Sequence, residues 1–562
     1  MTNIDTCELL SSTTIGIENE QDQHIQNSIF CDKFYDLISF KSEIVTFTKF
    51  YKALYEHGIE EQDIRLKNTT ENIANYLVYH DNDTVDKINF RKIIFKDVAF
   101  ISRIFKLELT IPKFDIFREK IGEIYKKCLD LNIDGQICQT CPRFSQFNPS
   151  AWSVSACTVD GQRCNFGDST YGLTLQSCFK PLIYAIASTL YGFDYVHKYV
   201  GMEACDYTDK ELTLDMNGMP YNPLINAGAL VTLSMIKPEL SLADRFQFLF
   251  KTLKRMTGNG YISYDNTMYL SRRKYSDGNY ALAYFLREKK CYPKNANMVD
   301  ALDLYNQMCS ITVTAQSGSV IAAMLANGGV CPSTSEVVLS PHAVRDTLSI
   351  MNSSGMDNYS GEFSFKIGLP AKSSSSGCMF VIVPNLLGIC LYSPELDKNE
   401  NSLRGLHFCQ KLIETFNFHK FDSDEENLKK INPRDLNTTN PNRHLSQLLM
   451  GASHGDLSVI RKYLLQGYDM KIEDYDKRTA LHIAAADGHL IAVKFLIEQC
   501  KIDINVKDRW GNTALDEAKR FKNLCVIYYL TNKKANQGSI DADEMKISMN
   551  EMKALYRKMS TK

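Results

Sequence analysis

A repeated motif in the last quarter of the chain constrains its fold more than any other sequence feature. The run Thr479–His489 (TALHIAAADGH) is followed 34 positions later by a weaker copy, Thr513–Ala518 (TALDEA). An earlier trace, Ala452–Asp456 (ASHGD), places Gly455 33 positions before Gly488. A period of about 33 residues predicts stacked helix pairs, because each unit can bury its apolar face only against its neighbours.

This motif resembles the ankyrin repeat, whose signature is T-P-L-H-x-A followed by Gly-His. Residues 444–533 are therefore expected to form helical ankyrin repeats that offer a surface to a protein partner. His482 falls at the histidine of the signature, so we expect a structural turn residue there and not a catalytic one. Residues 534–562 are expected to be a disordered tail.

Size and charge bound what the rest of the chain can be. With 562 residues the chain exceeds what one hydrophobic core can organise. Its 64 basic and 66 acidic residues leave a net charge of −2, too little to attract nucleic acid or anionic lipid. No stretch approaches the about 18 apolar residues of a membrane span. We expect a multidomain protein that binds neither nucleic acid nor a membrane.

The 17 cysteines are scattered without the spacing of a disulfide framework, which indicates reduced thiols. One pair, Cys138 and Cys141, has C-x-x-C spacing. No second pair and no nearby pair of histidines completes a zinc site, so no metal is expected there. Nothing in the sequence implies an organic cofactor.

The first 30 residues are polar and acidic, with no Lys or Arg among them. A mitochondrial transit peptide is rich in Arg and poor in acids, and a secretory signal needs a basic start and an apolar core. Residues 1–30 are expected to be a disordered tail. The expected location is the cytoplasm, with mitochondria left open.

Residues 31–131 show apolar side chains at helical spacing, as in the set Phe114, Phe117 and Ile121. The acidic segment that begins at Asp81 resembles a calcium loop. It has Asp86 at the sixth position, where Gly is required, and Lys92 at the twelfth, where Glu is required. We expect a helical, EF-hand-like domain without a calcium loop.

Residues 132–420 mix strand and helix patterns separated by glycine turns, which indicates an α/β domain. A polar linker is expected over residues 421–443. The expected strands are Ser153–Val159, Phe380–Val383 and Leu387–Leu391, and helices are expected to begin at Ser177, Asn226 and Ser317.

One short motif in this domain carries specific chemistry. In Gln176–Pro181 (QSCFKP), Ser177 and Lys180 are three residues apart and share one face of a helix. A buried lysine can take the serine proton, and the activated serine can then form an acyl-enzyme. The S-x-x-K pattern begins the active-site helix of class A β-lactamases, but alone it also fits an exposed lysine on an amphipathic helix.

The longer run LQSCFKPLIYAIA (Leu175–Ala187) resembles the active-site segment of the glutaminases, especially the animal kidney-type enzymes. The similarity extends from the helical domain through the ankyrin repeats. The other segments that carry it are Cys157–Arg163, Asn222–Ala229, Leu325–Gly329 and Gly368–Ser373.

The resemblance implies a serine β-lactamase-like fold and the hydrolysis of L-glutamine to L-glutamate and ammonia. Ser177 matches the family's nucleophile and Lys180 its general base. Lys372 begins the strand that flanks the nucleophile. The other implied site residues are Tyr305 in the pocket and the substrate-binding residues Gln176, Asn226, Asn279 and Ser375, the last through its backbone amide.

The sequence departs from the family pattern at several pocket positions. Thr140 replaces a tyrosine that reaches the reacting centre, and Asp357 replaces a tyrosine that assists proton transfer. Arg272 replaces a glutamate that binds the substrate's ammonium, which turns attraction into repulsion. Ser374 and Ser375 stand where the family has Gly-Val.

Because an arginine and an aspartate both enter one pocket, we expect Arg272 and Asp357 to form a buried ion pair. The family's loop of subunit contacts is here the charged run Asp206–Glu211, which puts phosphate activation and a tetramer or filament in question. A homo-oligomer, at least a dimer, is still expected.

Three functions therefore stay open at this point. The first is a glutaminase that acts on glutamine. The second is a catalytically impaired relative that acts as a scaffold or regulatory subunit. The third is an amidase for another substrate, with an anionic group where glutamine has its ammonium.

Overall fold

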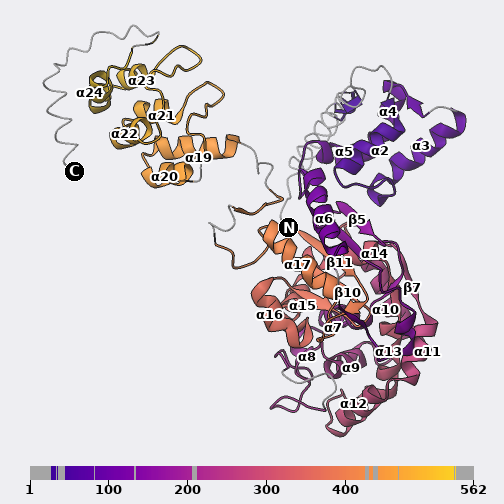
Figure 1. Cartoon of the computed structure of the whole chain (residues 1–562). Helices are drawn as coiled ribbons and strands as arrows, with labels where there is room; N and C mark the ends of the chain where they lie inside the picture. The colour runs from indigo at the N-terminus through magenta and orange to yellow at the C-terminus, as the bar shows by residue number, and fades with distance from the viewer. Residues whose placement is uncertain are drawn as a thin grey trace, which may run out of the picture. The chain divides into compact units, whose positions relative to one another are not determined.

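A computed structural model gives the fold of the chain, which divides into two compact units, residues 1–435 and 436–562 (Figure 1). Most of both predicted tails and the charged run Asp206–Glu211 lie outside the described residues. The structure describes residues 27–28, 30–32, 34–35, 45–80, 83–131, 134–205, 212–423, 429–434, 441–465, 468–536 and 538.

The N-terminal helices of the first unit pack around an aromatic core. Phe50 and Phe90 are buried, with ring centroids 5.6 Å apart in an edge-to-face arrangement. Two short strands pair antiparallel beside them, Val45 opposite Val85. The elements are β1 (Val45–Thr46), α2 (Phe47–Glu56), α3 (Lys67–Tyr79), β2 (Thr84–Val85), α4 (Lys87–Ile94) and α5 (Val98–Phe105).

Asp86, which stands where a calcium loop requires glycine, caps a helix. Its Oδ1 accepts hydrogen bonds from the backbone N–H groups of Ile88 and Asn89, at 2.9 and 3.0 Å, at the start of α4. These bonds lower the pKa of Asp86. Asp81 and Asn82, which begin the acidic segment, lie outside the described residues.

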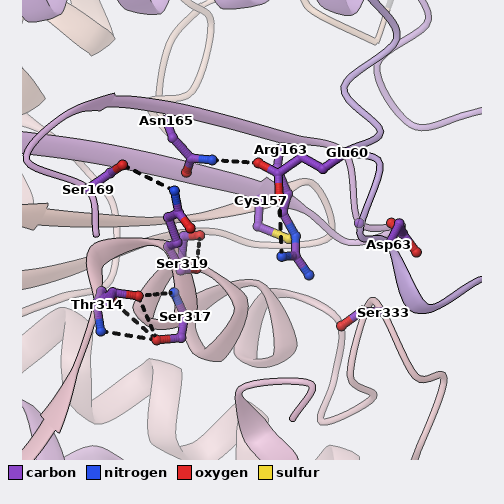
Figure 2. A network of polar contacts seen from close by, with 12 residues as sticks. Glu60, Asp63, Cys157, Arg163, Asn165, Ser169, Thr314, Ser317, Ser319 and Ser333 are labelled. Carbon is purple, nitrogen blue, oxygen red and sulfur yellow. Dashed lines mark hydrogen bonds and ion pairs between the residues drawn. The ribbon is translucent and has the colours of Figure 1, made fainter. Parts of the chain in front are cut away.

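Polar contacts join these helices to the next part of the same unit. The Gln162 side chain donates to the backbone oxygens of His57 and Ile111, each at 2.9 Å. Asn165 donates to Glu60 at 2.8 Å, beside Arg163 (Figure 2). These bonds satisfy buried polar groups and fix the helices against the strand that carries Arg163 and Asn165.

The centre of this unit is a five-stranded antiparallel sheet whose side chains alternate between two cores. Phe380 and Ile382 belong to one core, and Met379 and Val381 belong to the other. The sheet confirms the three predicted strands, with ends shifted by one or two residues. Its strands, in order across the sheet, are β5 (Arg163–Gly167), β4 (Ser153–Thr158), β11 (Leu387–Tyr392), β10 (Cys378–Val383) and β9 (Ala371–Ser373).

Helices cover both faces of the sheet, which is the layered architecture expected of a β-lactamase-like domain. α14 (Ala315–Ala326) lies so close to β11 that a Cβ at Gly388 would be 2.0 Å from the Ala323 nitrogen. On the other face α6 (Phe114–Leu129) packs beside α17 (Leu403–Thr415) (Figure 1). The close approach at Gly388 explains why that strand carries a glycine.

The remaining elements of this unit include the helices that line the site described below. None of the helices in the described parts of the chain is long and apolar enough to cross a bilayer. The elements are β3 (Gln136–Ile137), β6 (Leu173–Thr174), α7 (Phe179–Tyr191), α8 (Phe193–Val196), α9 (Asn226–Met235), α10 (Leu242–Met256), β7 (Ile262–Tyr264), α11 (Asn266–Lys274), α12 (Asp277–Glu288), α13 (Met298–Cys309), β8 (Ile311–Val313), α15 (Pro341–Ser354), α16 (Ser360–Lys366) and β12 (Glu395–Leu396).

The second unit consists of helix pairs at the predicted period. His482 is fully buried, and its Nδ1 lies 3.1 Å from the backbone nitrogen of Thr479, while its Nε2 lies 3.2 Å from the Asn512 oxygen. The prediction of a structural histidine is confirmed. The helices are α19 (Pro441–Ser453), α20 (Leu457–Leu465), α21 (Ala480–Ala486), α22 (Leu490–Glu498), α23 (Ala514–Arg520) and α24 (Leu524–Asn532).

Candidate active site

A cavity of about 440 Å³ in the first unit collects most of the predicted site residues. Its volume lies within the range of small-molecule sites. Gln176 and Lys180 lie behind the wall and are each 1% exposed, and Lys372 is fully buried. The predicted residues that line the cavity are Thr140, Ser177, Asn226, Arg272, Asn279, Tyr305, Asp357 and Ser375.

Ser177 lies on a 3₁₀ turn (η4, Gln176–Cys178) that leads into α7. The preceding residue, Gln176, has a φ of 44°, in the left-handed region that non-glycine residues rarely adopt. Two hydrogen bonds hold its side chain: Nε2 donates to Thr174 Oγ1 at 3.2 Å, and Oε1 accepts from Arg272 Nη1 at 2.8 Å. The strained turn presents Ser177 to the cavity.

The helical wall of the cavity carries a neutral polar pair. The Tyr305 hydroxyl, on α13, donates to Asn226 Oδ1 at 2.7 Å, at the first residue of α9. The Tyr305 ring packs edge-to-face against Phe179, with centroids 5.3 Å apart. This packing places an amide and a phenol in the same cavity as Ser177 without any added charge.

The sheet wall of the cavity carries a charged pair. Lys372 of β9 has a side chain with 0% exposure, and its Nζ donates to the two carboxylate oxygens of Asp357 at 3.1 and 3.2 Å. Asp357 begins a 3₁₀ turn (η5, Asp357–Tyr359) with a φ of 51°. An aspartate tolerates this conformation better than most residues, and its charge here balances a buried ammonium.

The expected Arg272–Asp357 ion pair is wrong. Asp357 pairs with Lys372, and Arg272 donates to the neutral amide of Gln176. Arg272 and Asp357 line one cavity but do not pair with each other, because each is bound to a different side chain.

Arg272 has little to balance its charge. Its Nε is buried without a hydrogen-bond partner, and no carboxylate among the described residues forms an ion pair with it. Burial raises the pKa of the nearby Cys309 thiol, although the charges of Arg272 and Lys180 oppose that rise. Cys309 therefore stays neutral near pH 7, and Arg272 remains a cation.

Thr140 lies at the cavity edge with the two C-x-x-C thiols. Its Oγ1 is 3.1 Å from Cys138 Sγ, and Cys141 Sγ is 3.0 Å from Ser271 Oγ. Both cysteines are buried free thiols. Across the part of the chain that the structure describes, no group of three or more His, Cys, Asp or Glu side chains could hold a metal ion.

Sequence reasoning missed several residues that line the cavity. The most consequential is Glu400, from the loop before α17, because it adds a carboxylate to the cavity. No local motif marks it, since only the tertiary fold brings that loop to the site. The others are Cys141, Leu212, Tyr275, Ser276, Gly278 and Leu282, whereas Ser374, which the sequence had placed in the pocket, also lines the cavity.

A larger cavity, of about 560 Å³, lies between the N-terminal helices and the sheet, bounded by Glu60, Asp63 and Arg163 among others (Figure 2). Its described lining has no serine followed three residues later by a buried lysine. The serine and the buried lysine therefore make the smaller cavity, of about 440 Å³, the candidate active site.

Sequence comparison assigns each of the three parts. The model of the family described as Glutaminase matches residues 135–421, that of an EF-hand domain matches residues 30–112, and that of three ankyrin repeats matches residues 448–541. The chain is 42% identical over 514 residues to the rat (Rattus norvegicus) protein named glutaminase liver isoform, mitochondrial, covering 91% of this chain and 85% of that protein.

More distant relatives match the central domain. A glutaminase of Nostoc sp. is 35% identical over 303 residues, covering 54% of this chain and 89% of that protein. A solved structure of Mglu in its glutamate form is 30% identical, with a TM-score of 0.51, covering 55% of this chain and 70% of that one. The fold, the clustering of the motif residues in one cavity and these comparisons agree: the chain belongs to the glutaminase family.

Proposed function

We propose that this chain hydrolyses the side-chain amide of L-glutamine to L-glutamate and ammonia through an acyl-enzyme on Ser177. One observation carries the proposal most: Ser177 lines the cavity, with a buried lysine one helical turn behind it. Three other polar side chains that suit an amide ligand share that cavity, namely Asn226, Asn279 and Tyr305.

In the first half-reaction the Ser177 Oγ attacks the amide carbon, and the Lys180 amine accepts the hydroxyl proton. The oxygen of the tetrahedral intermediate is stabilised by backbone N–H groups, for which we propose those of Ser177 and Ser375. The proton then passes to the leaving nitrogen, and ammonia departs. Tyr305 and Asn226, joined at 2.7 Å, orient the substrate during this step.

In the second half-reaction a water molecule attacks the glutamyl ester. Lys180 accepts a proton from the water, and the same proton returns to the Ser177 oxygen as the ester bond breaks. L-glutamate leaves, and the enzyme is restored. Asn279 and Gln176 contribute to substrate binding, Gln176 through the turn that it holds in place.

A scaffold without catalysis is the second candidate function. It is favoured by the replacements Thr140, Arg272 and Asp357, which all line the cavity. The retained Ser177 and buried Lys180 favour catalysis instead, since a scaffold needs neither.

Release of ammonia and glutamate from L-glutamine by the purified full-length chain, beside a Ser177→Ala variant, decides between the two. Turnover that disappears in the variant supports hydrolysis. Equal background rates from both proteins, together with no labelling of Ser177 by a serine-directed acylating probe, would establish the scaffold.

Assembly and location are part of the proposal. We propose at least a homodimer, and a protein ligand for the ankyrin repeats, whose stacked units suit protein binding. Size-exclusion chromatography with light scattering tests the proposed homodimer.

A cytoplasmic location stays a prediction, since the rat relative is named mitochondrial, and cell fractionation tests it.

A further inference from the structure

Gln176, the residue before the proposed nucleophile, has a backbone conformation that glutamine does not favour. Its φ is 44°, in the left-handed region, and the residue is 1% exposed. A non-glycine residue keeps such a conformation only where the surrounding contacts hold it. The contacts of the Gln176 side chain therefore help to determine where the Ser177 hydroxyl points.

Two hydrogen bonds hold the Gln176 side chain, and they differ in strength and in origin. Thr174 Oγ1, a neutral partner two residues away, accepts from Nε2 at 3.2 Å. Arg272 Nη1 donates to Oε1 at 2.8 Å, across 96 residues. A hydrogen bond from a charged donor is shorter and stronger than one between neutral groups. Arg272 is therefore the stronger of the two supports.

The helix that carries Arg272 is itself anchored. On α11 the Tyr269 hydroxyl donates to Asp303 Oδ1 of α13 at 2.7 Å. Tyr269 and Arg272 are three residues apart, so they share one face of the helix. The bond from Tyr269 ties that face to the helix that also carries Tyr305. The guanidinium thus reaches Gln176 from an element that is fixed to the wall of the cavity.

Two unfavourable features meet at this contact. The Nε of Arg272 is buried without a hydrogen-bond partner, and Gln176 has a strained backbone. Both features destabilise the fold, and backbone strain of this kind clusters at functional sites. Stability alone therefore gives no reason for the contact, whereas the position of the adjacent Ser177 does.

We propose that Arg272 is a positioning residue: through Gln176 it holds the turn that presents Ser177 to the cavity, and it supports the chemical step without binding the substrate. The role rests on the proposed amide hydrolysis at Ser177. Arg272 also lines the cavity, so direct contact with the substrate is the alternative that the experiments must exclude.

Steady-state kinetics on L-glutamine with the full-length chain separate the two roles. Arg272→Met keeps an apolar stem but has no donor. We expect kcat to fall about 30-fold, with KM within about threefold of its value in the unmodified protein. Arg272→Lys keeps a cationic donor and should restore kcat to within about fivefold of the unmodified protein. An unchanged kcat in Arg272→Met, with or without a rise in KM, would overturn the proposal.

The matched control is Arg273→Met, at the next and exposed position of the same helix. It makes the same change of side chain away from Gln176, and both kcat and KM should stay as they are in the unmodified protein. A fall in kcat equal to that of Arg272→Met would contradict a specific role for Arg272.

A double-mutant cycle tests whether Arg272 acts through Gln176. Gln176→Leu removes the acceptor, so adding Arg272→Met to that variant should lower kcat by less than about twofold. The full loss in both backgrounds would show that Arg272 acts by another route, and the proposal would be wrong. If Arg272→Met does not fold, the cycle is run with Arg272→Lys, whose smaller loss in kcat should likewise disappear beside Gln176→Leu.

Crystal structures of the unmodified chain and of Arg272→Met give a readout that does not depend on turnover. If the unmodified chain releases no ammonia, the proposed hydrolysis fails, and these structures then decide the positioning role. We expect Gln176 of the variant to leave the left-handed region and the Ser177 hydroxyl to move. A φ near 44° at Gln176, with Ser177 unmoved, would overturn the proposal.

Discussion

The ankyrin repeats and the amidase cavity build their polar contacts over different distances along the chain. In the repeats, His482 contacts Thr479, three residues away, and Asn512, in the next unit. In the cavity, Arg272 contacts Gln176 across 96 residues. Contacts within and between the repeats follow a motif that recurs in the sequence, whereas the charged side chains of the site have partners that no sequence motif marks.

The largest loss of activity should follow from a substitution of Ser177. Ser177→Ala removes the hydroxyl of the proposed nucleophile, and we expect glutamine turnover to fall by at least about 10³-fold. The melting temperature should change little, because Ser177 is partly exposed on the cavity and its side chain supports no described contact. Rate assays check the turnover, and calorimetry on the same preparation checks the melting temperature. Residual turnover within tenfold of the unmodified chain would remove Ser177 from the mechanism.

The next largest effect should be a loss of stability when the ion pair between Asp357 and Lys372 is broken. Asp357→Asn leaves the ammonium of Lys372, whose side chain is fully buried, without its carboxylate. A loss of about 2 kcal/mol in the stability of the first unit is expected, less than for a fully buried pair because Asp357 is 39% exposed.

The matched control for that variant is a short-range pair on α16. Glu362 and Lys366 are 2.6 Å apart, with side chains 53% and 54% exposed. Glu362→Gln should leave the stability of the first unit nearly unchanged, because water screens this exposed pair. Denaturant unfolding followed by a probe in the first unit checks both, and equal losses would contradict the contrast between the two pairs.

A smaller loss of activity is expected from a substitution in the helical wall of the cavity, which carries Tyr305 and Asn226. Tyr305→Phe removes the donor to Asn226, which lies 2.7 Å away, and keeps the ring packed against Phe179. We expect kcat/KM for glutamine to fall about tenfold, with the fold intact. A loss confined to KM would assign Tyr305 to binding, and a loss confined to kcat would assign it to the chemical step.

The smallest predicted effect is a pH-dependent change in the melting temperature of the ankyrin repeats. Burial lowers the pKa of His482, so the folded repeats favour the neutral imidazole. The unfolded chain then binds more protons as pH falls below about 6.5, and the stability present above that pH is lost as pH falls through the folded pKa. The melting temperature of the repeats should drop by a few degrees at acid pH, and His482→Gln should flatten this slope. His454→Gln, at an exposed position, should leave it unchanged.

The sequence predicted the elements better than the pairings. Continuous apolar runs located the strands around Phe380 and Ile389, because each of the two faces of the sheet buries its own core. The S-x-x-K motif placed Ser177 at a helix start, and Ser177 lies on the 3₁₀ turn that leads into α7. The repeat predicted a structural turn residue at His482, and this histidine has a structural role within α21, in the helix-capping contact with Thr479.

The partners of the charged residues could not be predicted in the same way. Arg272 and Asp357 were identified as pocket residues, but which cation meets Asp357 depends on distances that the fold sets. Glu400 reaches the cavity from a loop that has no motif. The left-handed backbone of Gln176 has no sequence signal either, since glutamine does not favour it.

The turn at Gln176 also has a consequence for how the protein is made. Thr174, which holds the Gln176 side chain, lies on β6, and β6 pairs with β8 at Thr312. The neighbouring Leu175 donates to the Ile311 oxygen at 2.9 Å. During translation, Ser177 emerges well over a hundred residues before the strand that secures its turn. A nascent chain therefore carries Ser177 without this turn geometry, which forms only when the domain is complete.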